Sequence, residues 1–285
     1  MYVEHQKIKR ERVTNTLLKP ITKGIFILAL FTLAFAGSFF SFGVGRASAA
    51  TVTTATPKTH ISSIGYSPDR VFFRTSDNKL VLIYSDTGHI YYRLSSDNGS
   101  TWGSAVNIKY VDDYTGYSFS GYIDNNDNIY LAYNPHRGAS QYVFMIKMTY
   151  SAGSYALGPE RTVESTGAST QAAPNIIKDP SNNLWVTYVY ANGSNYSINV
   201  RESVDDGATW GASTQLSSST SVALGSEFSS LAIYNNQYPV VAYVLYQSGA
   251  SRVYYRAYNG ASWSTEGVID ANTSQTPNFW LKERK

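Results

Sequence analysis

The stretch SSDNGSTW at residues 95–102 establishes the internal repeat of this chain. It returns as SVDDGATW at residues 203–210, and a shorter copy, YNGASW, occupies residues 258–263. The tryptophans that end these copies lie 108 and 53 residues apart, so one copy is missing near residue 156, where Tyr155 takes the tryptophan's place. A period of about 53 residues is typical of architectures that repeat one supersecondary unit.

The composition favours β-sheet. Of the 285 residues, 14% are aromatic, including 24 tyrosines, and only 15% are charged. Aromatic and β-branched side chains pack well on the pleated surface of a sheet. No stretch shows the i, i+3, i+4 spacing of apolar residues that a helix requires. We therefore expect an all-β domain with few helices.

Four repeats can be superposed, and each contains four short strands. A polar turn separates the first two strands, and these turns fall at residues 76–78, 124–128, 179–183 and 234–237. The third strand leads into the repeated box and the fourth strand leaves it. Because four antiparallel strands per repeat make one propeller blade, we predict a β-propeller of four-stranded antiparallel blades over residues 61–270.

The chain begins with a segment that differs from the repeats. Six basic residues precede the uncharged apolar run at residues 24–44, and an A-x-A pattern follows at residues 47–49. This order is typical of a secretory signal cleaved after Ala49. A run of 21 residues is also long enough for an uncleaved membrane anchor. With either alternative, the remainder of this bacterial-looking chain is secreted or displayed at the cell surface.

The other boundaries follow from composition and charge. Residues 50–60 are small and Thr-rich and form the expected linker, and residues 271–285 form a C-terminal tail. Without residues 1–49, the chain has 16 Lys and Arg against 18 Asp and Glu, so the positive net charge of the whole chain belongs to the signal. This balance offers no basis for nucleic-acid binding. The chain has no cysteine, so packing rather than disulfides must stabilise it.

The residue types of the box favour a tight turn. In residues 97–99 and 205–207, an aspartate can accept backbone N–H groups, and the glycine can adopt the positive φ of a tight turn. The hydroxyl residues around them can close the loop with further backbone bonds. We expect this turn between the third and fourth strands, with the final tryptophan packed against the neighbouring blade.

The pattern S-x-D-x-G-x-T-W resembles the Asp box, or BNR repeat, of the sialidase (neuraminidase) superfamily. Two copies match in full and two degenerate copies are in phase, so the resemblance covers roughly residues 60–270. Sialidases are six-bladed propellers whose Asp boxes lie on the face away from the active site. The resemblance therefore implies a propeller whose active site would lie at the opposite ends of the strands.

The resemblance also implies candidate site residues. Sialidases clamp the substrate carboxylate with arginines, which suits bidentate guanidinium geometry, and Arg70 and Arg74 lie near the start of the first repeat. An acid/base aspartate follows the second strand, where Asp86 falls, and a glutamate opens a later blade, where Glu227 falls. Each candidate also has a non-catalytic explanation. Asp86 lies in a sequence typical of a turn, and the other residues can be ordinary solvated side chains.

Two parts of a sialidase active site, a further arginine and the nucleophilic tyrosine, have no counterpart in this sequence. The chain reads VLYQ at residues 244–247, where another arginine is expected, and the four repeats end near Asp270. No last blade supplies the nucleophilic tyrosine. Three explanations stay open: a fragment of a longer protein, closure with four blades, or the need for a partner.

Two functions therefore remain open. The first is a sialidase-like glycoside hydrolase, or a fragment of one, with Asp86 as acid/base, Arg70 on the carboxylate and Glu227 assisting. The second is a non-catalytic propeller that binds a glycan, a glycoconjugate or a protein at the cell surface, because the fold alone does not choose between them. Candidate sugar-stacking platforms are aromatic residues expected in loops: Tyr110, Tyr114, Tyr117 and Tyr133.

We expect neither a metal nor a cofactor. Residues 124–128 read DNNDN, like the start of a calcium loop, but Ile129 replaces the glycine and Pro135 replaces the glutamate that such a loop requires. The four histidines are dispersed, and no dinucleotide or phosphate-loop fingerprint occurs. Membrane contact is expected only through the N-terminal segment, if that segment stays uncleaved.

Overall fold

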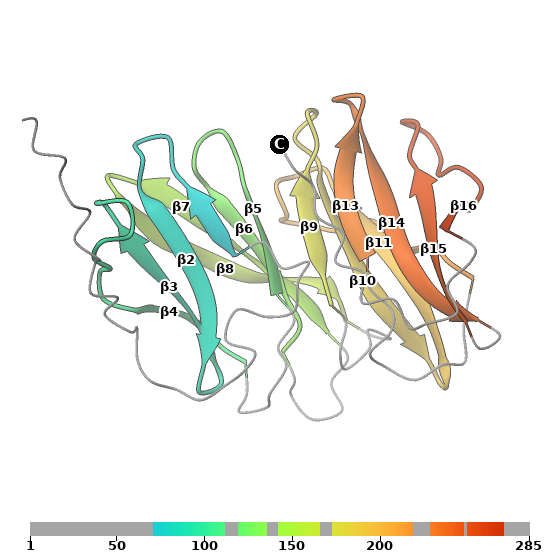
Figure 1. The fold of residues 1–285 in the computed structure, drawn as a ribbon, viewed down its shortest axis with the longest axis horizontal. Helices are drawn as coiled ribbons and strands as arrows, with labels where there is room; N and C mark the ends of the chain where they lie inside the picture. Colours follow the sequence, from blue (N-terminus) through green and yellow to red (C-terminus); the bar gives the residue numbers. More distant parts are fainter. Residues whose placement is uncertain are drawn as a thin grey trace, which may run out of the picture. The chain divides into compact units, whose positions relative to one another are not determined.

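The fold is all-β and consists of four blades. A computed structural model describes residues 71–111, 119–135, 142–165, 173–218, 229–247 and 250–270. These residues belong to one compact unit, Ala49–Lys285. They form sixteen strands in four antiparallel sheets of four strands each, and no helix occurs among them. This confirms the predicted propeller of four-stranded antiparallel blades (Figure 1).

Each blade is one repeat, and its strands are hydrogen-bonded in chain order. Blades 1 and 2 contain β1 (Phe72–Arg74), β2 (Leu80–Asp86), β3 (His89–Ser95), β4 (Val106–Tyr110), β5 (Phe119–Ile123), β6 (Ile129–Tyr133), β7 (Val143–Ser151) and β8 (Ser154–Glu164). Blades 3 and 4 contain β9 (Asn175–Lys178), β10 (Leu184–Asn192), β11 (Asn195–Ser203), β12 (Thr214–Gln215), β13 (Ser229–Tyr234), β14 (Tyr238–Gln247), β15 (Ala250–Ala257) and β16 (Gly267–Asp270). None of the described residues forms an apolar helix that could cross a membrane.

One aspartate holds the turn between the first and second strands in blades 2 and 3. Asp124 accepts hydrogen bonds from the backbone N–H groups of Asn126 and Asn128, both at 2.9 Å. Asp179 accepts the N–H of Asn183 at 2.8 Å in the same way. The Asn/Asp clusters predicted as turns are therefore turns, and the resemblance of residues 124–128 to a calcium loop reflects turn chemistry.

The box forms the turn that its sequence predicts. Asp97 accepts the backbone N–H of Thr101 at 2.8 Å and the Thr101 hydroxyl at 2.6 Å. The Ser95 hydroxyl donates to Asp97 at 2.8 Å and accepts the N–H of Gly99 at 2.8 Å, where φ is +88°. The second full copy repeats these contacts at the equivalent residues, which are Ser203, Asp205, Gly207 and Thr209.

In blades 2, 3 and 4, the ring that ends the box packs against the preceding blade. Tyr155 lies in the core between blades 1 and 2, Trp210 packs on the core between blades 2 and 3, and Trp263 packs on the core between blades 3 and 4. The structure thus confirms the predicted place of the box aromatic in blades 2, 3 and 4, which include the two degenerate copies. Trp102 of blade 1 instead contacts Phe72 of its own blade, with ring centroids 6.2 Å apart.

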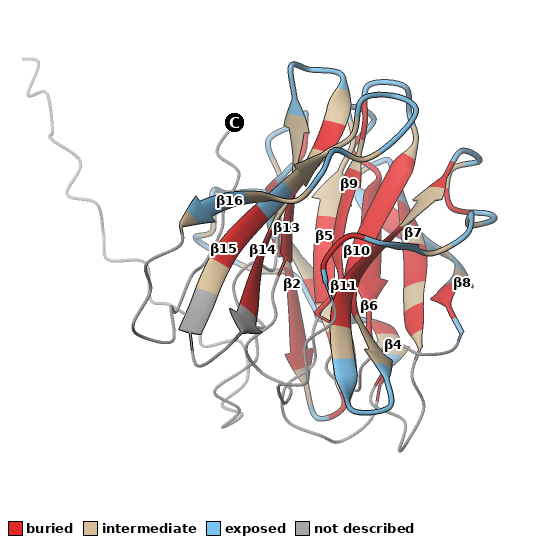
Figure 2. Ribbon diagram, turned by 90° about the vertical axis from the view of Figure 1, so that its right-hand side faces the viewer, coloured by how far each residue is buried: buried red, intermediate tan, exposed pale blue. Residues whose placement is uncertain are grey.

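Three hydrophobic cores join consecutive blades, and the alternation of side chains along the strands creates them. In β6, Leu131 and Tyr133 face blade 1, whereas Tyr130 and Ala132 face blade 3. All five residues of β6 are therefore buried. The central strands of blades 2 and 3 are buried along most of their length (Figure 2), so the interfaces between blades form the core of the fold.

A buried ion pair crosses the interface between blades 2 and 3. Glu164, at the end of β8, is only 3% exposed. It accepts the Tyr188 hydroxyl at 2.6 Å and two Arg201 nitrogens, Nε at 3.1 Å and Nη2 at 3.0 Å. Burial raises the pKa of Tyr188, and its hydrogen bond to Glu164 raises it further. A carboxylate of one blade thus neutralises an arginine of the next.

A substitution at Gly207 tests whether close packing of the box against the neighbouring blade stabilises the fold. Its φ is +86°, and a Cβ there would lie 2.0 Å from Met145 Cε and 3.3 Å from Leu184 Cδ1. We expect Gly207→Ala to lower the free energy of unfolding by about 2–4 kcal/mol, from backbone strain and overpacking together. Gly193→Ala is the control, because φ there is +62° with no atom within 4 Å. It should cost only about 1–2 kcal/mol in urea unfolding, and equal losses would contradict the packing account.

Acid titration tests the hydrogen bonds of the box. Bonds from the Thr209 hydroxyl, the Thr209 N–H and Ser203 lower the pKa of Asp205 to about 2 from its ordinary 3.8. The stability that this carboxylate contributes is therefore complete above about pH 4 and is lost as the pH falls towards 2. We expect Asp205→Asn to lower the urea midpoint at pH 7, and we expect this deficit to shrink to less than half at pH 2, where about half of the folded-state carboxylate is protonated. A deficit at pH 2 as large as that at pH 7 would contradict this origin.

Candidate functional site

Of the four residues predicted from the sialidase resemblance, the structure describes Arg74 and Asp86, and these two do not meet. Asp86 ends β2, and the Thr87 hydroxyl donates to its carboxylate at 2.8 Å. Arg74 ends β1 opposite Leu80, at the other end of β2, and its Nη1 lies 3.3 Å from Asn98. The seven residues of β2, from Leu80 to Asp86, span about 20 Å. Arg74 and Asp86 are therefore at opposite ends of blade 1.

The remaining two predicted residues, Arg70 and Glu227, lie outside the described residues. The catalytic roles of Arg70, Asp86 and Glu227 thus stay predictions. Asp86 does lie at the end of blade 1 opposite the box, since β2 ends there while β3 ends at Ser95.

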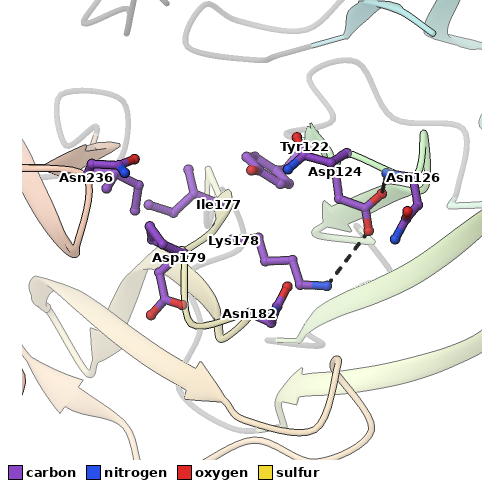
Figure 3. A pocket seen from close by; sticks show the side chains of 11 residues that line it. Tyr122, Asp124, Asn126, Ile177, Lys178, Asp179, Asn182 and Asn236 are labelled. Atoms are coloured by element: carbon purple, nitrogen blue, oxygen red, sulfur yellow. Dashed lines mark hydrogen bonds and ion pairs between the residues drawn. The ribbon is translucent and has the colours of Figure 1, made fainter. Parts of the chain in front are cut away.

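A polar hollow of about 690 Å³ lies at the box end of the blades, where the first strands end. We call it the turn hollow, and it is lined by Tyr122, Asp124, Asn125, Asn126, Ile177, Lys178, Asp179, Pro180, Asn182, Ile233 and Asn236. Figure 3 shows Lys178 reaching towards Asp124 across it, 3.8 Å apart. Its two aspartates are the ones that hold the turns of blades 2 and 3.

The charges beside the turn hollow neutralise one another. Lys178 Nζ lies 2.8 Å from the Tyr130 hydroxyl and 2.9 Å from Asp206 Oδ1, and Lys147 also pairs with Asp206. Burial raises the pKa of Tyr130, and its bond to Asp206 adds to this. Burial also opposes ionisation of Asp206, but hydrogen bonds from Lys147, Tyr130 and Lys178 outweigh it and lower its pKa. These groups stabilise the joint between blades 2 and 3 and do not form an acid/base pair.

A second hollow, of about 670 Å³, lies between blades 3 and 4 beside their boxes. We call it the tryptophan groove. Trp185 of β10 is nearly buried, at 3% exposure, and Tyr258 and Trp263 of blade 4 are half-buried. The Trp185 ring centroid lies 5.0 Å from that of Tyr258 and 5.8 Å from that of Trp263. The lining also includes Val200, Glu202, Val204, Thr209, Trp210, Gly211, Ala212, Thr214, Gln215, Arg256, Ala261 and Ser262.

Polar groups are placed among the rings of the groove. Burial raises the pKa of Glu202, and the nearby charge of Asp179 raises it further. Arg256 donates from Nη1 to the carbonyl oxygen of Ser264 at 2.9 Å. Trp185 Nε1 is held by Asp179 Oδ2 at 2.9 Å, which fixes this ring. The groove thus combines a rigid aromatic surface with a carboxylate and a guanidinium.

The sequence did not predict this groove. Of the four tyrosines that it predicted as sugar-stacking residues in loops, the structure describes two, Tyr133 and Tyr110. Tyr133, expected in a loop, is fully buried because it faces blade 1 from the middle strand β6. Tyr110 is 50% exposed, with its ring 4.8 Å from His89. Tyr114 and Tyr117 lie outside the described residues.

The sequence identifies two of the tryptophans that line the groove, but it does not indicate that the third lies beside them. Trp210 and Trp263 are in phase as box aromatics, but Trp185 comes from the middle of another repeat unit and meets them only when the blades pack. Within the described ranges, no group of three or more His, Asp or Glu side chains is arranged to hold a metal ion.

Comparison with known proteins gives no family. No family model and no curated protein match this chain, whereas 107 chains of solved structures match its shape. One is an ulvan lyase bound to a GlcA–Rha3S saccharide, at 11% identity and a TM-score of 0.48 over 76% of this chain and 60% of the lyase.

Two further matches have similarly low scores. The NanB sialidase from Streptococcus pneumoniae is 14% identical, with a TM-score of 0.44 over 64% of this chain and 29% of the sialidase. An endo-arabinase from Bacteroides thetaiotaomicron is 11% identical, with a TM-score of 0.47 over 75% of this chain and 85% of the arabinase. This chain spans less than two thirds of the lyase and of the sialidase. At these identities and TM-scores, nothing about its function follows from the similarity.

Proposed function

We propose that this chain is a non-catalytic, carbohydrate-binding propeller that holds a glycan or glycoconjugate in the tryptophan groove. The observation that carries the proposal is the convergence of three half-buried rings, Trp210, Tyr258 and Trp263, on one hollow. The buried Trp185 supports Tyr258 and Trp263 from beneath. The aromatic face of such rings packs on the apolar C–H surface of a sugar, while polar groups at the rim bind its hydroxyls.

The size and rigidity of the groove suit a small saccharide. Its volume of about 670 Å³ lies within the range of ordinary small-molecule sites. The rings contact one another, and Trp185 is anchored by Asp179, so little side-chain freedom is lost on binding. A pre-organised aromatic surface is what distinguishes a binding site from loosely exposed aromatics.

The charged groups indicate how the sugar would be oriented. Glu202 can accept hydrogen bonds from hydroxyl groups, and Arg256 can donate to ring or hydroxyl oxygens from within the same hollow. Because these groups are partly desolvated, hydrogen bonds to them discriminate strongly between ligands. We further propose that the protein acts outside the cytoplasm, secreted or at the cell surface, on the basis of its apolar segment at residues 24–44 and the A-x-A pattern that follows.

Binding to an array of immobilised oligosaccharides tests this proposal. We expect Trp263→Ala to weaken binding of the retained glycans at least about tenfold, which corresponds to about 1.4 kcal/mol and is less than the truncation of a central aromatic contact usually costs. Glu202→Gln should weaken the same glycans without altering the fold, as checked by circular dichroism.

Trp102→Ala is the matched control, because Trp102 ends the equivalent box of blade 1 but does not line the groove. Its binding should equal that of the unsubstituted protein. Equal losses in the Trp102 and Trp263 variants, or the absence of any bound glycan, would contradict the proposal.

A sialidase-like hydrolase is the second candidate, and one observation favours it. Asp86 lies in the β2–β3 hairpin, at the end of blade 1 opposite the box, which is the end that the resemblance requires. Under the non-catalytic proposal, we expect a fluorogenic sialoside to show no turnover above background at any pH between 4 and 8.

Variants at the two ends of blade 1 decide between the candidates. Turnover that falls at least about 100-fold in Asp86→Asn, but persists in Asp97→Asn at the box end, would overturn the non-catalytic proposal and support the hydrolase. Both substitutions remove one carboxylate, so their difference reports position rather than charge.

A further inference from the structure

The strand register of blade 3 places a carboxylate beside the rings of the tryptophan groove. Glu202 of β11 lies directly opposite Trp185 of β10, so both side chains stand on the face that blade 4 covers. Tyr258 and Trp263 of blade 4 pack on Trp185. The aromatic surface of the groove therefore has the carboxylate of Glu202 next to it.

This carboxylate has no cation to pair with. Glu202 forms no salt bridge and no side-chain hydrogen bond within the described part of the chain. Burial raises the pKa of Glu202, and the charge of Asp179 raises it further, as expected for a carboxylate without a cationic neighbour. Burial also raises the pKa of Tyr258, and the charge of Glu202 adds to this. Glu202 is only half-buried and lines an open hollow, so a ligand can reach it.

Arg256 also lines the groove, but its contacts lie elsewhere. Its Nη1 donates to the carbonyl oxygen of Ser264 at 2.9 Å. Its charge acts on the hydroxyl of Tyr243, which donates to Glu266 at 2.8 Å. Arg256 therefore does not neutralise Glu202.

The joint between blades 2 and 3 shows which groups bind a ring and a carboxylate in this fold. Tyr130 there takes the place of Trp185, since each is the second residue of the second strand of its blade. Lys178 Nζ lies 4.7 Å from the centroid of the Tyr130 ring, and Lys147 Nζ lies 5.4 Å from it. Both lysines also pair with the carboxylate of Asp206. Two ammonium groups of the protein are thus bound by an aromatic ring and a carboxylate.

Neither lysine has a counterpart between blades 3 and 4. Glu202 takes the place of Lys147, since each lies opposite the ring residue of its blade. Ile233 takes the place of Lys178, since each pairs with the residue four positions before a buried tyrosine of the next strand. This joint therefore has the rings, a carboxylate and a hollow, but not the two ammonium groups.

We propose that the glycan bound in the tryptophan groove contains an unacetylated amino sugar, whose ammonium group binds the carboxylate of Glu202 beside Tyr258 and Trp263. This inference rests on the proposed function. An ammonium group donates up to three hydrogen bonds and is attracted to aromatic faces, so it suits both features of the groove. An acetamido group has no charge, and a uronate would meet Glu202 with like charge.

The arrangement of the rings favours an amino sugar over a quaternary ammonium. Tyr258 and Trp263 contact each other, with centroids 5.3 Å apart, and both pack on Trp185. Rings in mutual contact leave no space between them for a methylated cation. A primary ammonium also has N–H groups that donate to Glu202, and a quaternary ammonium has none.

Calorimetric titration with two matched oligosaccharides tests the inference. The probes are oligomers of glucosamine and of N-acetylglucosamine, equal in length and linkage, at about pH 6, below the ordinary pKa of an amino group. We expect the glucosamine oligomer to bind at least about tenfold more tightly, because a hydrogen bond between two charged groups is stronger than one between an amide and a carboxylate.

The substitution Glu202→Gln removes the charge and keeps the shape of the side chain. We expect it to weaken binding of the glucosamine oligomer at least about tenfold and to leave the N-acetylglucosamine oligomer within about twofold. Glu160→Gln is the matched control, because Glu160 pairs with Lys109 and does not line the groove. It should keep the preference for glucosamine, and urea midpoints check that both variants are folded.

Three results would overturn the inference: equal or tighter binding of glycans without a free amino group, equal effects in the two Gln variants, or displacement of the glucosamine oligomer by choline. Each of these leaves the proposed function intact, provided that a glycan binds and Trp263→Ala weakens it. Absence of binding by every glycan would contradict both the inference and the proposed function.

Discussion

The alternation of side chains along the second and third strands of each blade is the constraint on which this structure depends. Because successive residues of a strand point to opposite faces, a strand such as β6 is apolar at every position and places half of its side chains in each of two cores. A single blade has two apolar faces and cannot be stable alone. Every other feature, from the box turns to the groove, is positioned by the stacking of these faces.

The box contributes to that stacking in two ways. Its aspartate satisfies the backbone of a tight turn, and its final ring reaches onto the core formed with the preceding blade. The tryptophan groove is a consequence of this arrangement. Trp263 extends back from blade 4 and meets Trp185 of blade 3, so a motif that is structural in each repeat lines the proposed binding site where two repeats meet.

The repeat period, the strands and the turn clusters could be predicted from the sequence because they depend on local chemistry. Glycine at a positive φ and aspartate bound to backbone N–H groups act within five residues, as at Asp97. The groove could not be predicted in this way, because Trp185 and Trp263 are far apart in the chain and meet only through blade packing. Tyr133 was misjudged for the same reason, since its burial depends on blade 1.

The proposed site lies at the box end of the blades, whereas the sialidase resemblance implies a site at the other end. The NMR spectrum of the indole N–H groups decides this most directly, because the chain has only five tryptophans. On titration with a glycan retained by the protein, the account predicts that the Trp210 and Trp263 signals shift while the Trp102 signal stays in place. Shifts confined to Trp102, or no shift at Trp210 and Trp263 while the glycan binds, would contradict it.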